Sequence, residues 1–292
     1  MSETKRLTLA SAEKWIDTPI PCLNHGFVIL KDYMGSDESI VQAARVSYGK
    51  GTKKNSDDKG LIAYLLRHRH TTPFEMVELK FHVKLPIFVA RQWIRHRTAS
   101  VNEISARYSV MDHEFYTPAD EDLRFQSTTN RQGGSSEDVP EELRAHVLSL
   151  LSQGCERGYT EYLEMIEGDI ARELARIHLP ISLYTQWYWK IDLHNLLHFL
   201  ALRMDEHSQY EIRVYANAMA DIVKDVVPWT WEAFEEFRLG ARIFSRSETK
   251  VLGQLLRKEE VALPESLRTG GRRREFEEKL RELGVDPGVL GT

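Results

Sequence analysis

The sequence has little cysteine, and this scarcity limits both structure and chemistry. Only Cys22 and Cys155 occur among 292 residues, so the chain can form neither a disulfide framework nor a zinc site made of cysteine alone. Both side chains are expected to be free thiols in a reducing compartment. We therefore predict a cytoplasmic protein.

Long apolar runs are also missing. No uninterrupted apolar segment approaches the roughly 20 residues that a membrane-spanning helix needs. The first residues, MSETKRLTLASAEKW, are polar and lack the apolar stretch of a secretory signal. The sequence therefore predicts no membrane partner.

A strong excess of one charge is absent as well. The 39 Lys and Arg residues nearly balance 44 Asp and Glu residues, which gives a formal net charge of −5. A chain so close to neutrality is not a bulk nucleic-acid binder, although a local basic cluster can still bind an anion. We therefore predict no nucleic-acid partner. With 42% apolar and 28% charged residues, the composition is that of a globular protein.

Two segments have the pattern of half-buried strands. Residues 77–85 alternate strictly between apolar and polar side chains, and residues 181–193 alternate in the same way. Helices are expected at 38–48, 61–70, 87–95, 140–166, 169–180 and 194–227, with Asp37 as the cap of the first, and with Leu143, Val147, Leu150, Leu151 and Tyr162 buried in the 140–166 helix. Because the order is not β-α-β, we predict an α+β fold with a central, mostly antiparallel sheet and flanking helices.

The chain divides into three segments by composition. Residues 1–22 form a polar lead-in, residues 23–244 a single domain, and residues 245–292 a charged C-terminal extension. The extension holds ten basic and nine acidic residues, so we expect a solvated helical or partly disordered appendage. Residues 124–139 are polar and rich in glycine and serine, which is typical of a mobile loop or an insertion.

The segment 91–109, RQWIRHRTASVNEISARYS, is unusually dense in groups that bind anions. Its arginines are interleaved with histidine, asparagine, serine and tyrosine, and guanidinium groups bind phosphate and carboxylate in a bidentate manner. This combination favours a phosphorylated ligand. A charged surface helix followed by a loop remains the alternative interpretation.

Two further groups of polar residues stand at helical spacing. Arg172 and Arg176 are four residues apart, as are His194 and His198, which precede Arg203. The histidines have no evident third ligand, so we predict no metal site, and ordinary core or surface histidines remain an alternative. The chain contains neither G-x-G-x-x-G nor G-x-x-x-x-G-K-[ST]. Arginines and histidines must therefore hold any dinucleotide that binds.

Residues 95–108 resemble the signature of one enzyme family. They fit R-H-R-x-x-S-x-N-E-x-S-x-R-Y at nine fixed positions, and this pattern is that of the flavin-dependent thymidylate synthases. The flanking segments 70–75, 86–93 and 198–203 are similar to the same family. The resemblance extends from about Gly26 to Phe237, and it leaves out the lead-in and the extension.

The resemblance implies a reaction, its cofactors and an assembly. It implies that dUMP is converted to dTMP, with methylenetetrahydrofolate as carbon donor and with NADPH-reduced FAD as hydride carrier. It also implies an α+β fold and a homotetramer whose active sites are shared between subunits. The alternatives are a folate- and flavin-dependent uracil methyltransferase that acts on RNA, and a non-catalytic nucleotide-binding protein.

The resemblance also assigns roles to individual residues. The residues implied to contact FAD are Thr72, Arg95, His96, Arg97, Glu103, Asp192, Leu193, His194 and His198. The residues implied to bind dUMP are Gln92, Trp93, Ile94, Arg95, Glu103, Ile104, Ser105, Ala106, Arg107, Arg176 and Arg203. Arg203 matches the position whose guanidinium stabilises the uracil ring ionised at N3, which makes C5 electron-rich enough to attack a one-carbon unit.

Two residues invite a nucleophilic interpretation that the sequence does not favour. Pro21-Cys22 is similar to the Pro-Cys of the cysteine-dependent thymidylate synthases, but nothing else around Cys22 matches that family. Ser105 has no neighbour in the sequence that is evidently a base, so we interpret it as a ligand contact. The roles of His70, the folate site and the function of the C-terminal extension stay open.

Overall fold

The computed structural model describes residues 7–46, 57–127 and 133–291. It divides into two compact units, Met1–Phe234 and Glu235–Thr292. The boundary lies ten residues before the one expected from composition at 244/245. No helix in the part of the chain that the structure describes is both long enough and apolar enough to cross a bilayer.

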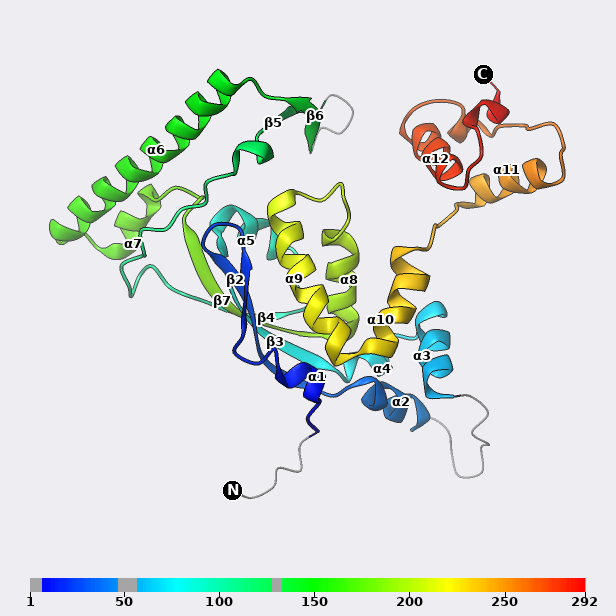
Figure 1. Ribbon diagram of the computed structural model, residues 1–292, viewed down its shortest axis with the longest axis horizontal. Coiled ribbons are helices and arrows are strands. Elements are labelled where there is room, and N and C mark those ends of the chain that lie inside the picture. The colour runs from blue at the N-terminus through cyan, green and yellow to red at the C-terminus, as the bar shows by residue number, and fades with distance from the viewer. Residues whose placement is uncertain (1–6, 47–56, 128–132, 292) are drawn as a thin grey trace. The chain divides into compact units, whose positions relative to one another are not determined.

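The first unit is built on a five-stranded antiparallel sheet (Figure 1). The strands follow the order β1 (Pro19–Cys22), β2 (Gly26–Met34), β3 (Glu78–Pro86), β7 (Tyr184–Asp192) and β4 (Ser100–Glu103). Strands β3 and β7 are the two that alternation predicted, and the α+β class is confirmed. The segment 1–22, expected as a lead-in, contributes β1 to the edge of this sheet.

The helices of the first unit lie between and after these strands. They are α1 (Ala10–Glu13), α2 (Asp37–Arg45), α3 (Asp58–Arg67), α4 (Thr72–Glu75), α5 (Ile87–Trp93), α6 (Glu141–Glu167), α7 (Arg172–Ala175), α8 (Leu193–Arg203), α9 (Tyr210–Val226) and α10 (Pro228–Phe234). Figure 1 shows α8 and α9 side by side, where they pack against each other. The helix predicted over 194–227 is therefore two helices. The last two residues of the helix predicted at 38–48 lie outside the described residues.

An aromatic core fixes the elements that carry the signature. Alternation in β7 directs Trp187 and Trp189 to the buried face of the sheet, where both are less than 3% exposed. Trp93, the last residue of α5, is fully buried against them, with ring centroids 5.5 and 5.3 Å away. Phe199 of α8 stacks on Trp93 at 4.7 Å. The end of α5 and the face of α8 are thereby held together.

The long helix α6 begins and ends where the sequence predicts, but its buried face differs. Tyr162 is fully buried, whereas Leu143, Leu150 and Leu151 are each more than 40% exposed. An apolar side chain is buried only where another element covers it. The periodicity of a helix shows which residues share its apolar face, but not which part of that face another element covers. The prediction that these three leucines are buried was wrong.

The segment predicted as a loop or insertion contains a small hairpin. Strands β5 (Arg124–Gln126) and β6 (Gly134–Asp138) pair in antiparallel fashion. Residues 128–132, between them, lie outside the described part of the chain, so the predicted mobility of that stretch stays a prediction.

The cap predicted for α2 is wrong by one residue. Ser36 caps this helix, with Ser39 completing a capping box. Asp37 is buried and instead accepts hydrogen bonds from Trp229 N (2.8 Å) and Thr230 N (3.0 Å), at the start of α10. The capping rule considers only neighbouring residues, so it favoured Asp37 as the cap of α2. The carboxylate of Asp37 instead accepts a hydrogen bond from a residue 192 positions later, in α10.

The second unit folds around its own apolar core. It contains α11 (Arg246–Leu256), α12 (Gly271–Glu282) and two short turns, at Glu265–Leu267 and Pro287–Leu290. Its core residues are at most 3% exposed and are Val251, Leu267, Phe276, Leu280 and Leu290. Among the residues that the structure describes, the extension is helical as expected, but its apolar residues form a core of their own instead of staying solvated.

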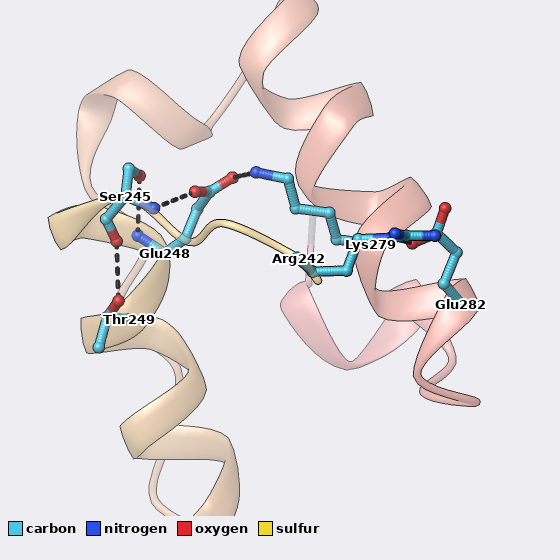
Figure 2. A network of polar contacts seen from close by, with 6 residues as sticks. All are labelled: Arg242, Ser245, Glu248, Thr249, Lys279 and Glu282. Carbon is cyan, nitrogen blue, oxygen red and sulfur yellow. Dashed lines mark hydrogen bonds and ion pairs between the residues drawn. The ribbon is translucent and has the colours of Figure 1, made fainter. Parts of the chain in front are cut away.

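A network of hydrogen bonds caps the N-terminus of α11 in this unit. Ser245 and Glu248 form a capping box, and Lys279 Nζ of α12 donates to Glu248 at 2.8 Å (Figure 2). Glu248 is only 5% exposed, and its pKa is held below the usual value because its hydrogen bonds to Lys279 and Ser245 outweigh the cost of burial. The mixed charges that suggested disorder pair with one another.

Candidate active site

The first part of the candidate site is the turn between α5 and β4. Its start is fixed because His96 N donates to the carbonyl of the buried Trp93 at 2.9 Å. Arg95 and Arg97 on either side are exposed, and no carboxylate among the described residues pairs with them. Two unneutralised guanidinium groups therefore face solvent beside one half-buried imidazole.

Arg203, the last residue of α8, reaches this turn. Its Nε–H donates to His96 Nε2 at 3.0 Å. Because Nε2 accepts, the neutral ring carries its proton on Nδ1. Burial and the nearby charges of Arg203 and His198 lower the pKa of His96 to about 4. Burial also lowers the pKa of Arg203, yet a guanidinium remains charged at neutral pH.

Strand β4 brings Glu103 to the same side of the sheet as the aromatic core. Glu103 is opposite Trp187 in the antiparallel register, so both side chains point to one face. The hydroxyl of the buried Thr185 donates to Glu103 Oε1 at 2.7 Å. Ile104 N donates to the carbonyl of Gln186 at 2.9 Å. This edge strand therefore presents a carboxylate with a fixed orientation.

The turn after β4 gathers a second group of arginines. Arg107 N donates to Ser105 Oγ (3.3 Å), and Arg107 Nη2 donates to Tyr108 Oη (3.3 Å). Arg172 Nη1 donates to the carbonyl of Tyr108 at 3.4 Å, and Arg176 lies one helical turn later. None of these three arginines has a carboxylate partner among the described residues. The group suits a phosphate.

The two arginine groups make no direct contact with each other. No hydrogen bond, ion pair or ring contact between described residues joins Arg203 to Arg107 or Arg176. Ala106, the residue before Arg107, packs against the cluster of Met111, Phe115, Cys155 and Leu183. The described residues thus present two groups of arginines that can each bind an anion.

The residues predicted on and before α8 have unequal access to a ligand. Both oxygens of Asp192 are used as the helix cap, by Asn195 N (3.0 Å) and Asn195 Nδ2 (2.7 Å). Leu193 is fully buried. His198 is exposed and its ring lies 6.3 Å from that of His96, while His194 is partly exposed. The structure therefore brings His198 to the site and gives Asp192 and Leu193 a role in forming the helix.

The remaining predicted residues also differ in exposure. Thr72 is exposed at the start of α4, which packs against α8. The Oε1 atom of Gln92 is buried without a hydrogen-bond partner among the described residues, so a donor from a ligand can satisfy it. The Trp93 side chain is fully buried, and any contact from that position must come from the backbone. Ile94 is 40% exposed.

The donor set fits FAD without a glycine-rich motif. The pyrophosphate of FAD is dianionic, and Arg95 and Arg97 supply two charges that no described carboxylate neutralises. His96 is neutral and adds an imidazole that can face an aromatic or polar group. No group of three histidine, cysteine or acidic side chains that could hold a metal ion occurs in the described ranges.

A large cleft lies elsewhere and contains none of the predicted site residues. It measures about 1320 Å³, and its walls include Tyr116, Asp122, Tyr210, Glu211 and Leu150. Burial and the neighbouring acids Glu121 and Glu211 raise the pKa of Asp122. Arg124 and Arg213 line the same cleft, so acidic and basic side chains occur together along its walls. The arginine groups around the signature remain the better candidate for a nucleotide site, because they carry the residues that the sequence singled out.

Sequence reasoning missed residues that lack a motif of their own. Thr185, which fixes Glu103, lies in the apolar part of β7, and only the pairing of β4 with β7 connects them. Phe199 contacts His96 edge-on at 4.9 Å. Arg172 stood out by its spacing but received no role. No signal in the sequence could have revealed the first two contacts.

The fold is of the α+β class, and the site offers exposed arginines that suit a phosphorylated ligand. The profile of the family described as "Thymidylate synthase complementing protein" matches residues 29–229. The chain is 53% identical to a flavin-dependent thymidylate synthase of Rickettsia bellii, over 96% of this chain and 98% of the relative. It is 58% identical to one of Gluconobacter oxydans, over 88% of this chain and 86% of that relative.

A solved structure agrees with these relatives. The UMP/dUMP methylase PolB from Streptomyces cacaoi, bound with 5-Br dUMP, superposes with a TM-score of 0.66 at 34% identity. The match covers 75% of this chain and 99% of that one. The chain therefore belongs to the flavin-dependent thymidylate synthase family, and the resemblance seen in its sequence is confirmed.

Proposed function

We propose that this enzyme reductively methylates dUMP to dTMP, with FAD as its cofactor and with methylenetetrahydrofolate and NADPH as co-substrates. The observation that carries the proposal is the set of arginines around the signature, which no carboxylate among the described residues neutralises. Bound FAD supplies the hydride chemistry. The protein supplies binding, orientation and charge.

The cofactor is proposed to bind at the α5–β4 turn. Arg95 and Arg97 offer charge-assisted hydrogen bonds to its phosphates, and His96, Glu103 and His198 line the same region. Thr72 and His194 are proposed to add contacts. Asp192 and Leu193 support the cofactor by shaping the start of α8 rather than through free side-chain atoms.

The substrate is proposed to bind along β4 and the turn that follows it. Ser105, Ala106 and Arg107, together with Arg176, suit the phosphate, because backbone N–H groups and guanidinium groups bind anions together. Gln92, Glu103 and Ile104 are proposed to contact the same substrate. Trp93, Ile94 and Arg95 complete the proposed set, with Trp93 acting through its backbone.

Arg203 is proposed as the catalytic residue. A cation beside the uracil ring stabilises the anion formed when N3 ionises, and this makes C5 nucleophilic. No protein thiol is needed. Cys22 is 1% exposed and burial raises its pKa to about 12, so a thiolate nucleophile at this position is disfavoured.

We further propose a homotetramer with shared active sites, located in the cytoplasm. The apolar side chains of Leu174 and Ile177, on either side of Arg176, are 57% and 80% exposed, and a second subunit that covers them would also reach this arginine group. The thiols of Cys22 and Cys155 are free and buried, which agrees with a reducing compartment.

The proposal is tested with the purified protein and with an Arg97→Ala variant. We expect the visible spectrum of bound flavin, and dTMP from dUMP only when folate donor and NADPH are present. UMP and a uracil-containing RNA serve as competing substrates. The variant should lose flavin, because one charge-assisted contact to the pyrophosphate is removed. Methylation of RNA but not of dUMP, or a protein without flavin, would contradict the proposal.

A further inference from the structure

The partner of Arg203 is unusual for a partly buried arginine. A desolvated guanidinium ordinarily pairs with a carboxylate, since an uncompensated buried charge is costly. In the described part of the chain, the side chain that accepts from Arg203 is the imidazole of His96, at 3.0 Å. This partner orients the guanidinium through Nε and carries no negative charge.

The histidine is itself held in place from two directions. His96 N donates to the carbonyl of Trp93 at 2.9 Å, which fixes its backbone. Its ring meets Phe199 edge-on at 4.9 Å, and Phe199 stacks on Trp93 at 4.7 Å. Both contacts depend on the aromatic core, so the acceptor atom has a defined position.

The imidazole of His96 therefore orients the Arg203 guanidinium without neutralising its charge. The hydrogen bond uses Nε, and both terminal nitrogens of Arg203 remain available to a ligand. A carboxylate in the same position would orient the guanidinium equally well, but it would cancel the charge that stabilises an anion nearby.

We propose that His96 is a positioning residue: its neutral imidazole aims the Arg203 guanidinium at the uracil ring and leaves its full positive charge available to the ionised N3. The inference rests on the proposed function, because it needs a uracil ring at Arg203. It gives His96 a role toward the substrate in addition to its proposed contact with FAD.

The charged surroundings keep His96 in the form that this role requires. Burial, Arg203 and His198 act in the same direction, and the imidazole stays neutral over the range in which the enzyme is expected to work. Both groups come from α8. A protonated ring would have no lone pair for Arg203 and would repel it.

The test uses three substitutions of His96 that separate the effect of its hydrogen-bond acceptor from the effect of a charge at its position. His96→Gln keeps a neutral acceptor, His96→Glu keeps the acceptor but adds a negative charge, and His96→Leu removes the acceptor. The same Gln and Glu changes at Thr98, an exposed residue two positions after His96 that has no assigned role in binding, serve as matched controls.

Four measurements are made on each holoenzyme. They are flavin content, flavin reduction by NADPH, single-turnover dTMP formation per flavin-loaded site, and the ultraviolet difference spectrum of bound 5-fluoro-dUMP, which reports ionisation of N3. We expect His96→Gln to stay within a few-fold of the unchanged enzyme. His96→Glu and His96→Leu should slow dTMP formation by about 100-fold, with flavin reduction preserved. In His96→Glu the bound analogue should ionise at a higher pH.

The outcomes distinguish this inference from the proposed function. Equal rates per flavin-loaded site in His96→Gln and His96→Glu would overturn it and leave His96 a cofactor contact. An equal loss in Thr98→Glu would overturn it too, because the effect would then come from nearby charge in general. Failure of the unchanged enzyme to form dTMP would instead refute the proposed function.

Discussion

The arginines of the candidate site are distinguished by how closely they gather. Arg157 and Arg273 each pair with a glutamate four residues later, whereas Arg95, Arg97 and Arg203 have no such partner among the described residues. Arg213 and Arg268 also lack a carboxylate in the described ranges and donate to backbone carbonyls, so one unpaired arginine does not mark a site. Three of them around the single imidazole of His96 can bind one anionic ligand together.

The first prediction at this scale concerns the chemical step. Arg203→Ala should lower single-turnover dTMP formation by about 100- to 1000-fold, because a charge that acts mainly in the transition state is lost. Arg203→Lys should recover only part of the rate, because an ammonium lacks the planar fork and the Nε that binds His96. Rapid-quench measurement at saturating dUMP checks both.

Flavin reduction by NADPH is the control for these variants, and it should be unchanged because the uracil ring takes no part in it. Near-normal dTMP formation in Arg203→Ala would show that the residue is structural.

A second prediction follows from the low pKa of His96. The folded-state pKa is about 4 and the usual value is 6.5, so between these values the unfolded chain binds more protons than the folded chain. The free energy of unfolding should therefore fall as the pH drops from about 7 to 4. For a half-buried group the loss is about 1 to 2 kcal/mol. Denaturation curves at several pH values measure it.

His96→Gln should make this dependence shallower over the same range. The exposed His146 of α6 provides the matched control, His146→Gln, which should leave the slope unaltered. An unchanged slope in the His96 variant would contradict the assignment.

At the scale of elements, connections between distant segments hold the first unit together. Asp37 of α2 accepts from two backbone N–H groups of α10 and from the Thr230 hydroxyl at 2.6 Å. It thus serves as a cap for the first turn of α10. Thr185 of β7 fixes Glu103 of β4 in a similar way. Such contacts are invisible to rules that consider neighbouring residues alone.

The third prediction tests the long-range cap. Asp37→Ala leaves two buried donors and one part-buried donor without an acceptor, so the free energy of unfolding should fall by about 2 to 3 kcal/mol. All six tryptophans lie before residue 235, so tryptophan fluorescence during denaturation reports on the first unit alone. Glu38→Ala, at the exposed next residue, is the control and should change stability by less than about 0.5 kcal/mol. Equal effects of the two substitutions would refute the cap.

At the scale of the whole molecule, the chain is two units with separate cores. The family match covers residues 29–229, which lie within the first unit. The second unit has its own buried apolar residues and its own capping network. Its core residues all follow residue 244. The chemistry and this unit are therefore expected to be separable.

The fourth prediction is that removal of residues 245–292 preserves flavin binding and dTMP formation to within about two-fold. The physical reason is that the truncation removes every fully buried residue of the second core and leaves behind only Phe244 of the side chains packed against it. Flavin absorbance and turnover check the activity, and the tryptophan denaturation midpoint checks the first unit.

Phe276→Ala in the full chain is the companion experiment. Loss of a buried phenylalanine costs about 3 to 5 kcal/mol, enough to unfold so small a unit. Circular dichroism should then show less helix while tryptophan fluorescence stays the same. A truncated chain that loses flavin would show that the units depend on each other.

The sequence by itself determined the family, the two central strands and the residues that carry the signature. These depend on local order: strict alternation specifies a strand with one buried face, and a dense run such as 95–108 keeps its pattern whatever surrounds it. The sequence of the extension did not reveal its core, because the few apolar residues that form it are spread over 40 positions and come together only in the folded unit.

Only the tertiary structure decided which of these residues meet. His96 and Arg203 are 107 positions apart, Glu103 and Thr185 are 82 apart, and Asp37 and Thr230 are 193 apart. Each contact requires the sheet register and the stacking of helices on the aromatic core to form first. Local propensity contains no information about such pairs, because their geometry comes from packing of the whole unit.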